Sequence, residues 1–140
     1  MTLPWPCLIR PAEPSDTGLV AHSWVESYYR GSRDVRCVKV SHYRQPMFRR
    51  VERVLSSSST LVACEPDDRD HLLGWVCWRG PTLHYVYVTQ LRRSSGLMAA
   101  LLDAADREGQ LETYSHRTDR WMSMEDSRTL RFNPCALWHL

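Results

Sequence analysis

Hydrophobic side chains recur at helical spacing in two segments of the first half of the chain. Between residues 19 and 29, Val20, Trp24 and Tyr28 fall on one face of an amphipathic helix. A second helix is predicted from about residue 45 to residue 55, with an apolar face made by Met47, Val51, Val54 and Leu55. Residues 31–42, between the two helices, show neither the helical nor the strand periodicity of hydrophobic residues, which predicts irregular structure.

Short runs rich in β-branched and aromatic residues predict strands in the rest of the chain. These runs are separated by turn residues and cover residues 7–10, 60–64, 72–78, 82–88, 110–115 and 128–132. A further helix is predicted from residue 96 to residue 107, with Gly109 ending it, and a short one over residues 119–127. Gly74, inside a predicted strand, indicates a bulge or the close approach of another element. The element order is therefore β-α-α-β-β-β-α-β-α-β.

The segment from Leu83 to Leu102 combines a strand, a basic turn, a glycine and a helix. The turn contains Arg92 and Arg93, and Gly96 opens the apolar helical run. The first N–H groups of a helix lack internal partners and carry partial positive charge, and a glycine lets a ligand approach the backbone closely. This order of elements predicts a phosphate-binding site. The alternative is an ordinary strand–turn–helix with solvated arginines.

Composition places the chain among ordinary soluble proteins. A length of 140 residues suits one domain, residues 1–140, and the chain is 43% hydrophobic and 24% charged. Neither a signal peptide nor an uninterrupted apolar run long enough to span a membrane is visible in the sequence, so we expect a cytoplasmic protein. The five cysteines are dispersed and contain no Cys-x-x-Cys pair. Together with the histidine spacing, this predicts neither a disulfide framework nor a metal site.

Basic residues gather on one predicted helix, although the net charge of the chain is only +2. Arg49, Arg50 and Arg53 lie opposite the apolar face of the second helix. Such a face could attract an acidic acceptor or nucleic acid, but a solvated helix face is the more common case. The small net charge argues against tight, sequence-independent binding of DNA.

The strand–turn–helix segment resembles the acetyl-coenzyme A site of the GNAT-type N-acetyltransferases. The family pattern is Gln/Arg-x-x-Gly-x-Gly/Ala after a strand with a Val-x-Val core. Val86-Tyr87-Val88 matches that strand, and Arg93-Ser94-Ser95-Gly96-Leu97-Met98 matches the loop. Met98 departs from the pattern, because the family prefers glycine or alanine there. The element order along nearly the whole chain is also that of the GNAT fold.

The resemblance implies a mixed α/β fold, with a mostly antiparallel sheet that splays between its fourth and fifth strands. It implies acetyl-coenzyme A as co-substrate and an amine acceptor, either a protein or a small molecule. In the family, the pantetheine arm pairs with the backbone of the fourth strand like an added strand. The residues implied to bind the cofactor are Val86, Tyr87, Val88, Arg93, Ser94, Ser95, Gly96, Leu97 and Met98.

The resemblance does not supply the usual catalytic residues. Thr82 stands where many members place a glutamate base. Side chains alternate along a strand, so Thr82, His84, Val86 and Val88 are expected on one face, which makes His84 the candidate base. The last predicted helix contains no tyrosine to protonate the leaving thiolate, and Tyr114 is the nearest replacement. Packing roles for His84 and Tyr114 stay open, and His116 is a weaker candidate acid than Tyr114.

Two functions remain open at this point, with a third less supported. The first is an active N-acetyltransferase, favoured by the loop and by His84. The second is a binding or inhibitory protein on the same fold with weak or no catalysis, favoured by Thr82, Met98 and the missing tyrosine. Nucleic-acid binding is supported only by the arginine face of the second helix. Three segments also resemble small phage and prophage proteins of this kind: Leu83–Val88, Tyr114-Ser115-His116 and Asn133-Pro134. Homodimer formation is left open.

Overall fold

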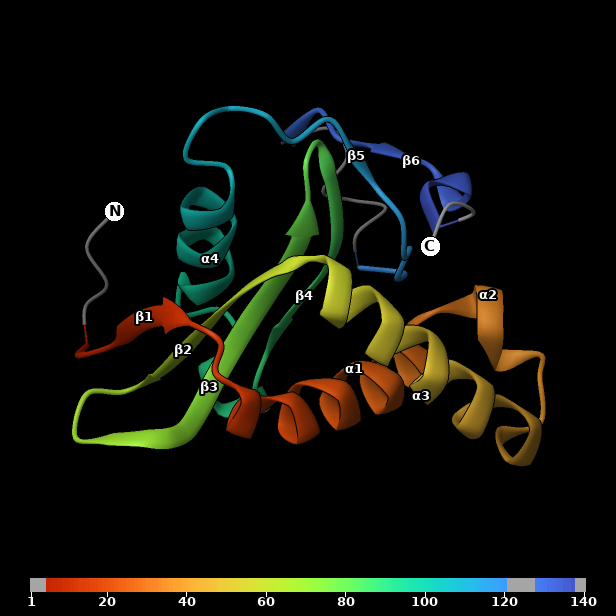
Figure 1. Cartoon of the computed structure of the whole chain (residues 1–140), viewed down its shortest axis with the longest axis horizontal. Helices are drawn as coiled ribbons and strands as arrows, with labels where there is room; N and C mark the ends of the chain where they lie inside the picture. Colours follow the sequence, from red (N-terminus) through yellow and green to blue (C-terminus); the bar gives the residue numbers. More distant parts are fainter. Residues whose placement is uncertain (1–4, 121–127, 138–140) are drawn as a thin grey trace.

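The protein is built on a six-stranded mixed sheet in which the strands follow one another in chain order (Figure 1). The computed structural model describes residues 5–120 and 128–137. Strands β1 to β4 are antiparallel neighbours, and β5 and β6 continue the sheet in parallel. The strand bounds are Leu8–Pro11 (β1), Ser59–Glu65 (β2), Asp68–Arg79 (β3), Thr82–Val88 (β4), Thr113–Tyr114 (β5) and Arg131–Phe132 (β6).

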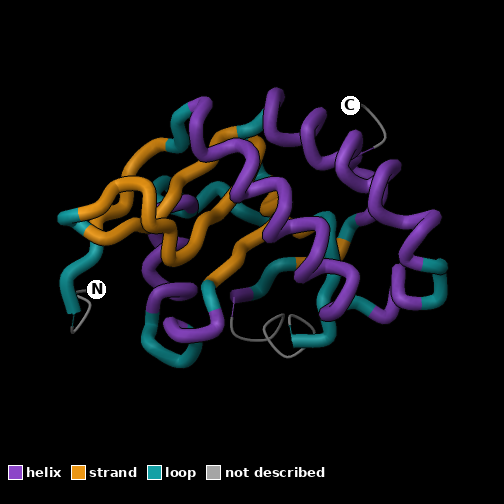
Figure 2. The backbone as a smooth tube through the Cα atoms, turned by 90° about the horizontal axis from the view of Figure 1, so that it is seen from below, coloured by secondary structure: helices purple, strands orange, loops and turns teal. Residues whose placement is uncertain are grey.

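Helices cover both faces of the sheet. The two long helices lie side by side over one face, and α4 lies against the other (Figures 1 and 2). The helices are α1 (Thr17–Gly31), α2 (Arg33–Arg36), α3 (Val40–Ser57) and α4 (Leu97–Ala105), with 3-10 turns η1 (Pro14–Asp16), η2 (Gln90–Arg92) and η4 (Pro134–Leu137). Each face has its own buried cluster: Trp24, Val51 and Trp75 on the α1/α3 side, and Val86, Leu97 and Leu101 on the α4 side. Cys64 and Cys77 are fully buried thiols.

The sheet splays open after the first residues of β4. Strand β5 pairs only with Thr82 and Leu83, through Thr113 and Tyr114. Within the described part of the chain, residues 85–88 of β4 therefore have a strand neighbour on the β3 side but none on the β5 side. This confirms the expected mixed α/β fold with its splay between the fourth and fifth strands.

A β-bulge interrupts β4 at His84. Tyr85 lies opposite Cys77 of β3, whereas Leu83 lies opposite Trp78, so His84 is the extra residue. A bulge breaks the alternation of side chains along a strand. The prediction that His84 shares a face with Val86 and Val88 was therefore wrong, because Leu83 joins their cluster instead and His84 turns towards His116.

Several elements differ in length from the sequence prediction. Helix α3 begins at Val40 rather than near residue 45, because Tyr43 in its first turns is buried and donates a hydrogen bond of 2.7 Å to the Val25 carbonyl. The region predicted as irregular also contains α2. Strands β5 and β6 are shorter than predicted, and α4 ends at Ala105 rather than residue 107. The helix predicted over residues 119–127 lies largely outside the described residues.

Gly74 lies where α4 packs closely on the sheet, as its position in the strand predicted. A Cβ atom there would lie 2.6 Å from the Tyr87 carbonyl oxygen and 3.2–3.3 Å from side-chain carbons of Leu97 and Leu101. We expect Gly74→Ala to lower the free energy of unfolding by about 1–3 kcal/mol, the usual cost of overpacking. Urea unfolding measures this, and Gly18→Ala, with open space around it, should not destabilise. Equal stabilities for the two variants would contradict the close packing.

Candidate active site

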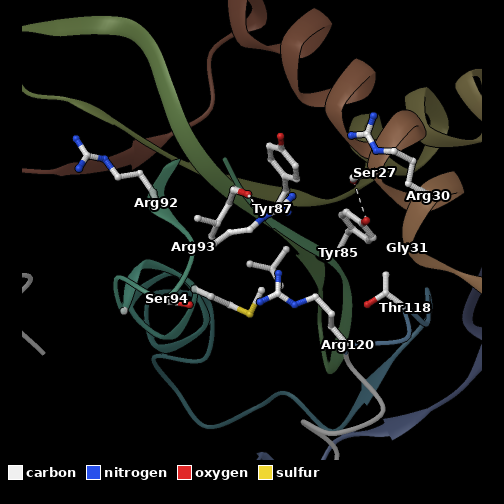
Figure 3. A pocket seen from close by; sticks show the side chains of 14 residues that line it. Ser27, Arg30, Gly31, Tyr85, Tyr87, Arg92, Arg93, Ser94, Thr118 and Arg120 are labelled. Carbon is white, nitrogen blue, oxygen red and sulfur yellow. Dashed lines mark hydrogen bonds between the residues drawn. The ribbon is translucent and has the colours of Figure 1, made fainter. Parts of the chain in front are cut away.

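A cavity of about 450 Å³ opens beside the unpaired half of β4 (Figure 3). Its lining comes from the end of α1, from β4, from the turn before α4 and from the segment after β5. Seven of the nine residues predicted to bind the cofactor line it: Val86, Tyr87, Val88, Arg93, Ser94, Gly96 and Met98. The fold thus brings the strand and the loop of the sequence motif together around one space.

The backbone of β4 offers free hydrogen-bonding groups to this cavity. The Tyr87 carbonyl faces Gly74 of β3, as the close approach at Gly74 shows. Alternation along the strand then turns the N–H and C=O groups of Val86 and Val88 the other way, towards the splay. The weak bond of 3.4 Å from Arg93 Nε to the Val88 carbonyl lies on that side. An extended, amide-containing ligand can pair with this edge as a further strand would.

The turn before α4 presents the helix N-terminus to the cavity. Gly96 has φ 89° and Ser94 has φ 63°, both in the left-handed region, and α4 begins at Leu97. The first N–H groups of α4 have no partner within the helix. The Ser95 hydroxyl donates to the Arg92 carbonyl and the Leu97 side chain is fully buried, so these two residues contribute backbone rather than side chains. This arrangement favours a phosphate group.

The cavity is strongly basic. Four arginines line it, Arg30, Arg92, Arg93 and Arg120, and none of its described lining residues is acidic. Arg92 points away from the cavity centre in Figure 3, because its guanidinium lies 3.4 Å from Glu65 and stacks 4.4 Å from the Trp5 ring centroid. Arg120 reaches towards the middle of the space from the opposite side. A polyanionic ligand is therefore favoured over a neutral or cationic one.

The end of the cavity away from the loop is closed by polar groups from α1 and β4. The Ser27 hydroxyl and the Tyr85 hydroxyl are 2.8 Å apart (Figure 3). Burial raises the pKa of Tyr85, so its hydroxyl stays protonated near neutral pH. Gly31 and Thr118 complete this end. These groups can hold the carbonyl-bearing end of a ligand whose phosphates lie at the loop.

A buried chain of three polar side chains lies behind this end. Ser115 Oγ is 2.8 Å from His84 Nδ1 and 2.9 Å from His116 Nδ1. His84 and His116 are only 2% and 3% exposed, and His84 Nε2 has no hydrogen-bond partner among the described residues. A hydroxyl has one proton to donate, so Ser115 accepts from one ring and donates to the other. The chain can therefore pass a proton between the two rings.

Burial controls the protonation of both histidines. Desolvation, with the nearby charge of Arg79, lowers the pKa of His84 to about 4. Desolvation, with smaller contributions from His84 and Arg50, lowers the pKa of His116 to about 3. Both rings are therefore neutral at pH 7, and each carries a single N–H proton.

These lowered pKa values predict acid sensitivity. A histidine in the unfolded chain has a pKa of about 6.5. Below that pH the unfolded chain binds protons that the folded histidines do not bind, so the free energy of unfolding is highest above about pH 6.5 and falls towards pH 4. We expect the free energy of unfolding to drop by roughly 3 kcal/mol or more between pH 7 and pH 4.5. Urea titrations at each pH measure this drop. His116→Asn should roughly halve it, since His84 remains, whereas His22→Asn, at an exposed position, should leave it unchanged. A pH-independent stability over this range would contradict the burial of neutral rings.

The remaining sequence predictions lie elsewhere in the fold. Tyr114 is 2% exposed and packs against Phe132 in the α4-side cluster, outside the lining of the cavity. Its role as an acid stays a prediction. In the described part of the chain, no group of three or more His, Cys, Asp or Glu side chains could hold a metal ion. No helix over the same residues is long and apolar enough to cross a membrane.

Comparison with known proteins gives structural matches only. No protein-family model matches the chain, and neither does any curated protein. A GCN5-related N-acetyltransferase from Rhodopseudomonas palustris superimposes with a TM-score of 0.64 at 18% identity, over 91% of this chain and 82% of that one. A histone acetyltransferase HPA2 and related acetyltransferase from Corynebacterium glutamicum gives 0.65 at 15% identity, over 88% and 83%.

A third solved structure shares the same architecture. A ribosomal-protein-alanine N-acetyltransferase from Brucella melitensis gives a TM-score of 0.51 at 17% identity, over 92% of this chain and 80% of that one. The protein has the GNAT fold. At these identities the likeness establishes the fold, and the chemistry has to be argued from the residues of this chain.

Sequence analysis missed the residues that close the cavity. Ser27, Arg30 and Gly31 lie at the end of α1, and Thr118 and Arg120 follow β5. No local motif marks them. The backbone bond of 2.8 Å from Asp119 N–H to the Gly31 carbonyl brings the two segments together. The sequence predicted α1 and the strand after α4 as separate elements, but no pattern in it indicated that the segments next to them are in contact.

Proposed function

We propose that the protein is an N-acetyltransferase that moves an acetyl group from acetyl-coenzyme A to an amine. The observation that carries the proposal is the shared cavity of the open β4 edge and the α4 N-terminus, lined by arginines and by no described acidic residue. Coenzyme A has the matching chemistry, with phosphates at one end and an amide-containing arm at the other. The GNAT fold of the structural neighbours supports the same function.

The cavity would receive the cofactor in one orientation. The pyrophosphate would lie on the N–H groups after Gly96, next to Arg93, where the helix N-terminus favours negative charge. The pantetheine amides would pair with the backbone of Val86 and Val88. The thioester would then lie near Tyr85 and Ser27, whose hydroxyls can stabilise the oxyanion of the tetrahedral intermediate.

Transfer also requires that the attacking ammonium lose a proton. His84 is the base we propose, acting together with Ser115 and His116, and all three side chains lie behind the lining of the cofactor cavity. The amine nitrogen forms the new bond to the acetyl carbon as the bond to sulfur breaks. After the first proton has left the ammonium, a second leaves the nitrogen when the amide forms; the thiolate takes up one proton and solvent receives the other.

A second function is favoured by one specific observation. The lowered pKa values of His84 and His116, about 4 and about 3, make both rings weak proton acceptors at neutral pH. A protein that binds the cofactor with little or no catalysis is the alternative. The two functions are separated by incubating the protein with acetyl-coenzyme A and a panel of amines and peptides and measuring thiol release. Amine-dependent release supports the transferase, and binding without release supports the alternative.

A further inference from the structure

The positive charges of the cofactor cavity are divided between its two ends. Arg92 and Arg93 flank the turn before α4, where the pyrophosphate is proposed, whereas Arg30 lines the opposite end, where the thioester is proposed. Residues 86–88 of β4 lie between the two ends. The phosphates of coenzyme A would therefore lie a whole pantetheine arm away from Arg30. Coenzyme A by itself gives no counter-ion to this guanidinium.

Arg30 lies next to the hydroxyl groups that close its end of the cavity. It follows Ser27 by about one turn of α1, and Figure 3 shows the two side chains beside each other. The Ser27 hydroxyl is 2.8 Å from the Tyr85 hydroxyl. Burial raises the pKa of Tyr85, and the positive charge of Arg30 is close enough to oppose that rise. An anionic group held near these hydroxyls would therefore also be attracted by Arg30.

No carboxylate in the described segments neutralises Arg30. Its side chain is exposed and forms no ion pair with the described acidic residues. The acidic residues of the neighbouring segments are already paired, Asp34 with Arg117 and Asp119 with Arg36, each at 2.8 Å. A negative charge delivered to this end of the cavity would thus gain an ion pair without displacing a described one.

The wall at the thioester end has room for more than an acetyl group. Ser27, Gly31 and Thr118, which are all small, form this wall. Even a Cβ atom added at Gly31 would lie 3.8 Å from Thr118, an ordinary van der Waals separation. A longer acyl chain can therefore extend past the hydroxyls towards the exposed side of Arg30.

We infer that the protein also accepts acyl-coenzyme A donors whose acyl group ends in a carboxylate, and that Arg30 binds this carboxylate. This inference rests on the proposed function. In the transfer, the nitrogen of the neutral amine bonds to the acyl carbon, and the carbon–sulfur bond breaks with its electron pair on sulfur. The nitrogen loses one proton to solvent and the thiolate takes one up. The distal carboxylate is unchanged and appears on the amide product.

Pairs of donors that differ in charge but not in shape test this assignment. Malonyl-coenzyme A is compared with isovaleryl-coenzyme A, and succinyl-coenzyme A with isocaproyl-coenzyme A, because a carboxylate and an isopropyl group have the same number of heavy atoms. The two pairs differ in the reach of the acyl chain. In at least one pair we expect the carboxylated donor to bind about 5- to 20-fold more tightly by calorimetry, between the gain from an exposed ion pair and that from a charged hydrogen bond.

Variants of Arg30 locate the charge responsible for the preference. Arg30→Gln should remove the preference, and Arg30→Lys should retain most of it. Arg49→Gln is the matched control, because it also removes one positive charge but at an exposed position outside the cavity lining. The preference should persist in this control.

Three outcomes would overturn the inference. They are equal affinity for both members of both pairs, a preference that survives Arg30→Gln, and a preference that Arg49→Gln removes as fully as Arg30→Gln does. Calorimetry of coenzyme A and amine-dependent thiol release from acetyl-coenzyme A test the proposed function separately. A protein that binds and transfers the acetyl group but shows no preference for a carboxylated donor keeps the proposed function and loses this inference.

Discussion

Gly96→Glu should lower the affinity for coenzyme A about 100-fold or more, equivalent to losing at least two charged hydrogen bonds. The new carboxylate would stand at the amino end of α4, where the proposed pyrophosphate binds, and would repel it. Gly96 also adopts φ 89°, a conformation that other residues rarely take. Isothermal titration calorimetry with coenzyme A measures the change directly.

Gly109→Glu is the matched control for this variant. Gly109 also has a left-handed φ, 67°, and a Cβ there would meet nothing within 4 Å, but the residue lies outside the cavity lining. It reproduces the backbone strain and the added charge without touching the proposed phosphate position. Similar losses of affinity in both variants would show that strain, and not the phosphate site, is responsible.

His84→Gln should reduce the turnover number by about 10²–10⁴-fold, the usual range for loss of a general base. Glutamine fills much of the same space and can still bond to Ser115, but it cannot accept a proton. Coenzyme A affinity should change little, because β4 contacts the pantetheine arm through its backbone. Steady-state kinetics with an amine found in the thiol-release screen gives the turnover number, and calorimetry gives the affinity.

Ser115→Ala distinguishes a relay from a single base. If the proton passes between His116 and His84, removing the hydroxyl that joins them should slow turnover as His84→Gln does. If His84 acts without Ser115, only the histidine variant is slow. Full turnover in a stably folded His84→Gln protein would remove His84 from the mechanism and leave it as a packed residue of the sheet.

The fold could be predicted largely from local patterns. The helical spacing around Trp24 and Val51 and the β-branched runs of β2 to β4 are strong signals, because each of these elements buries one or both faces. The lengths of β5 and β6 were overestimated, since only two residues of each are paired. Tyr43 lengthened α3 through a contact with α1 that no local pattern reveals.

The cavity motif was predictable for a different reason. Val86, Val88, Arg93 and Gly96 lie within one short stretch of chain, and the resemblance of that stretch to the GNAT cofactor motif implied that they surround one ligand. The orientation of the His84 side chain was not predictable, because side chains alternate regularly between the two faces only in a strand without a bulge. The bulge at His84 moved this ring off the Val86 face and towards Ser115 and His116, which follow β5 about 30 residues later.

Calorimetric titration of acetyl-coenzyme A into the purified protein tests the central claim most directly. The arginine-lined cavity beside the open edge of β4 predicts a one-to-one complex with a dissociation constant between about 1 μM and 1 mM, the usual range of substrate concentrations for enzymes. Gly96→Glu should weaken this binding about 100-fold or more, and Gly109→Glu should retain it. No binding to the unmutated protein at about 1 mM cofactor, or binding that is indifferent to Gly96→Glu, would contradict the account.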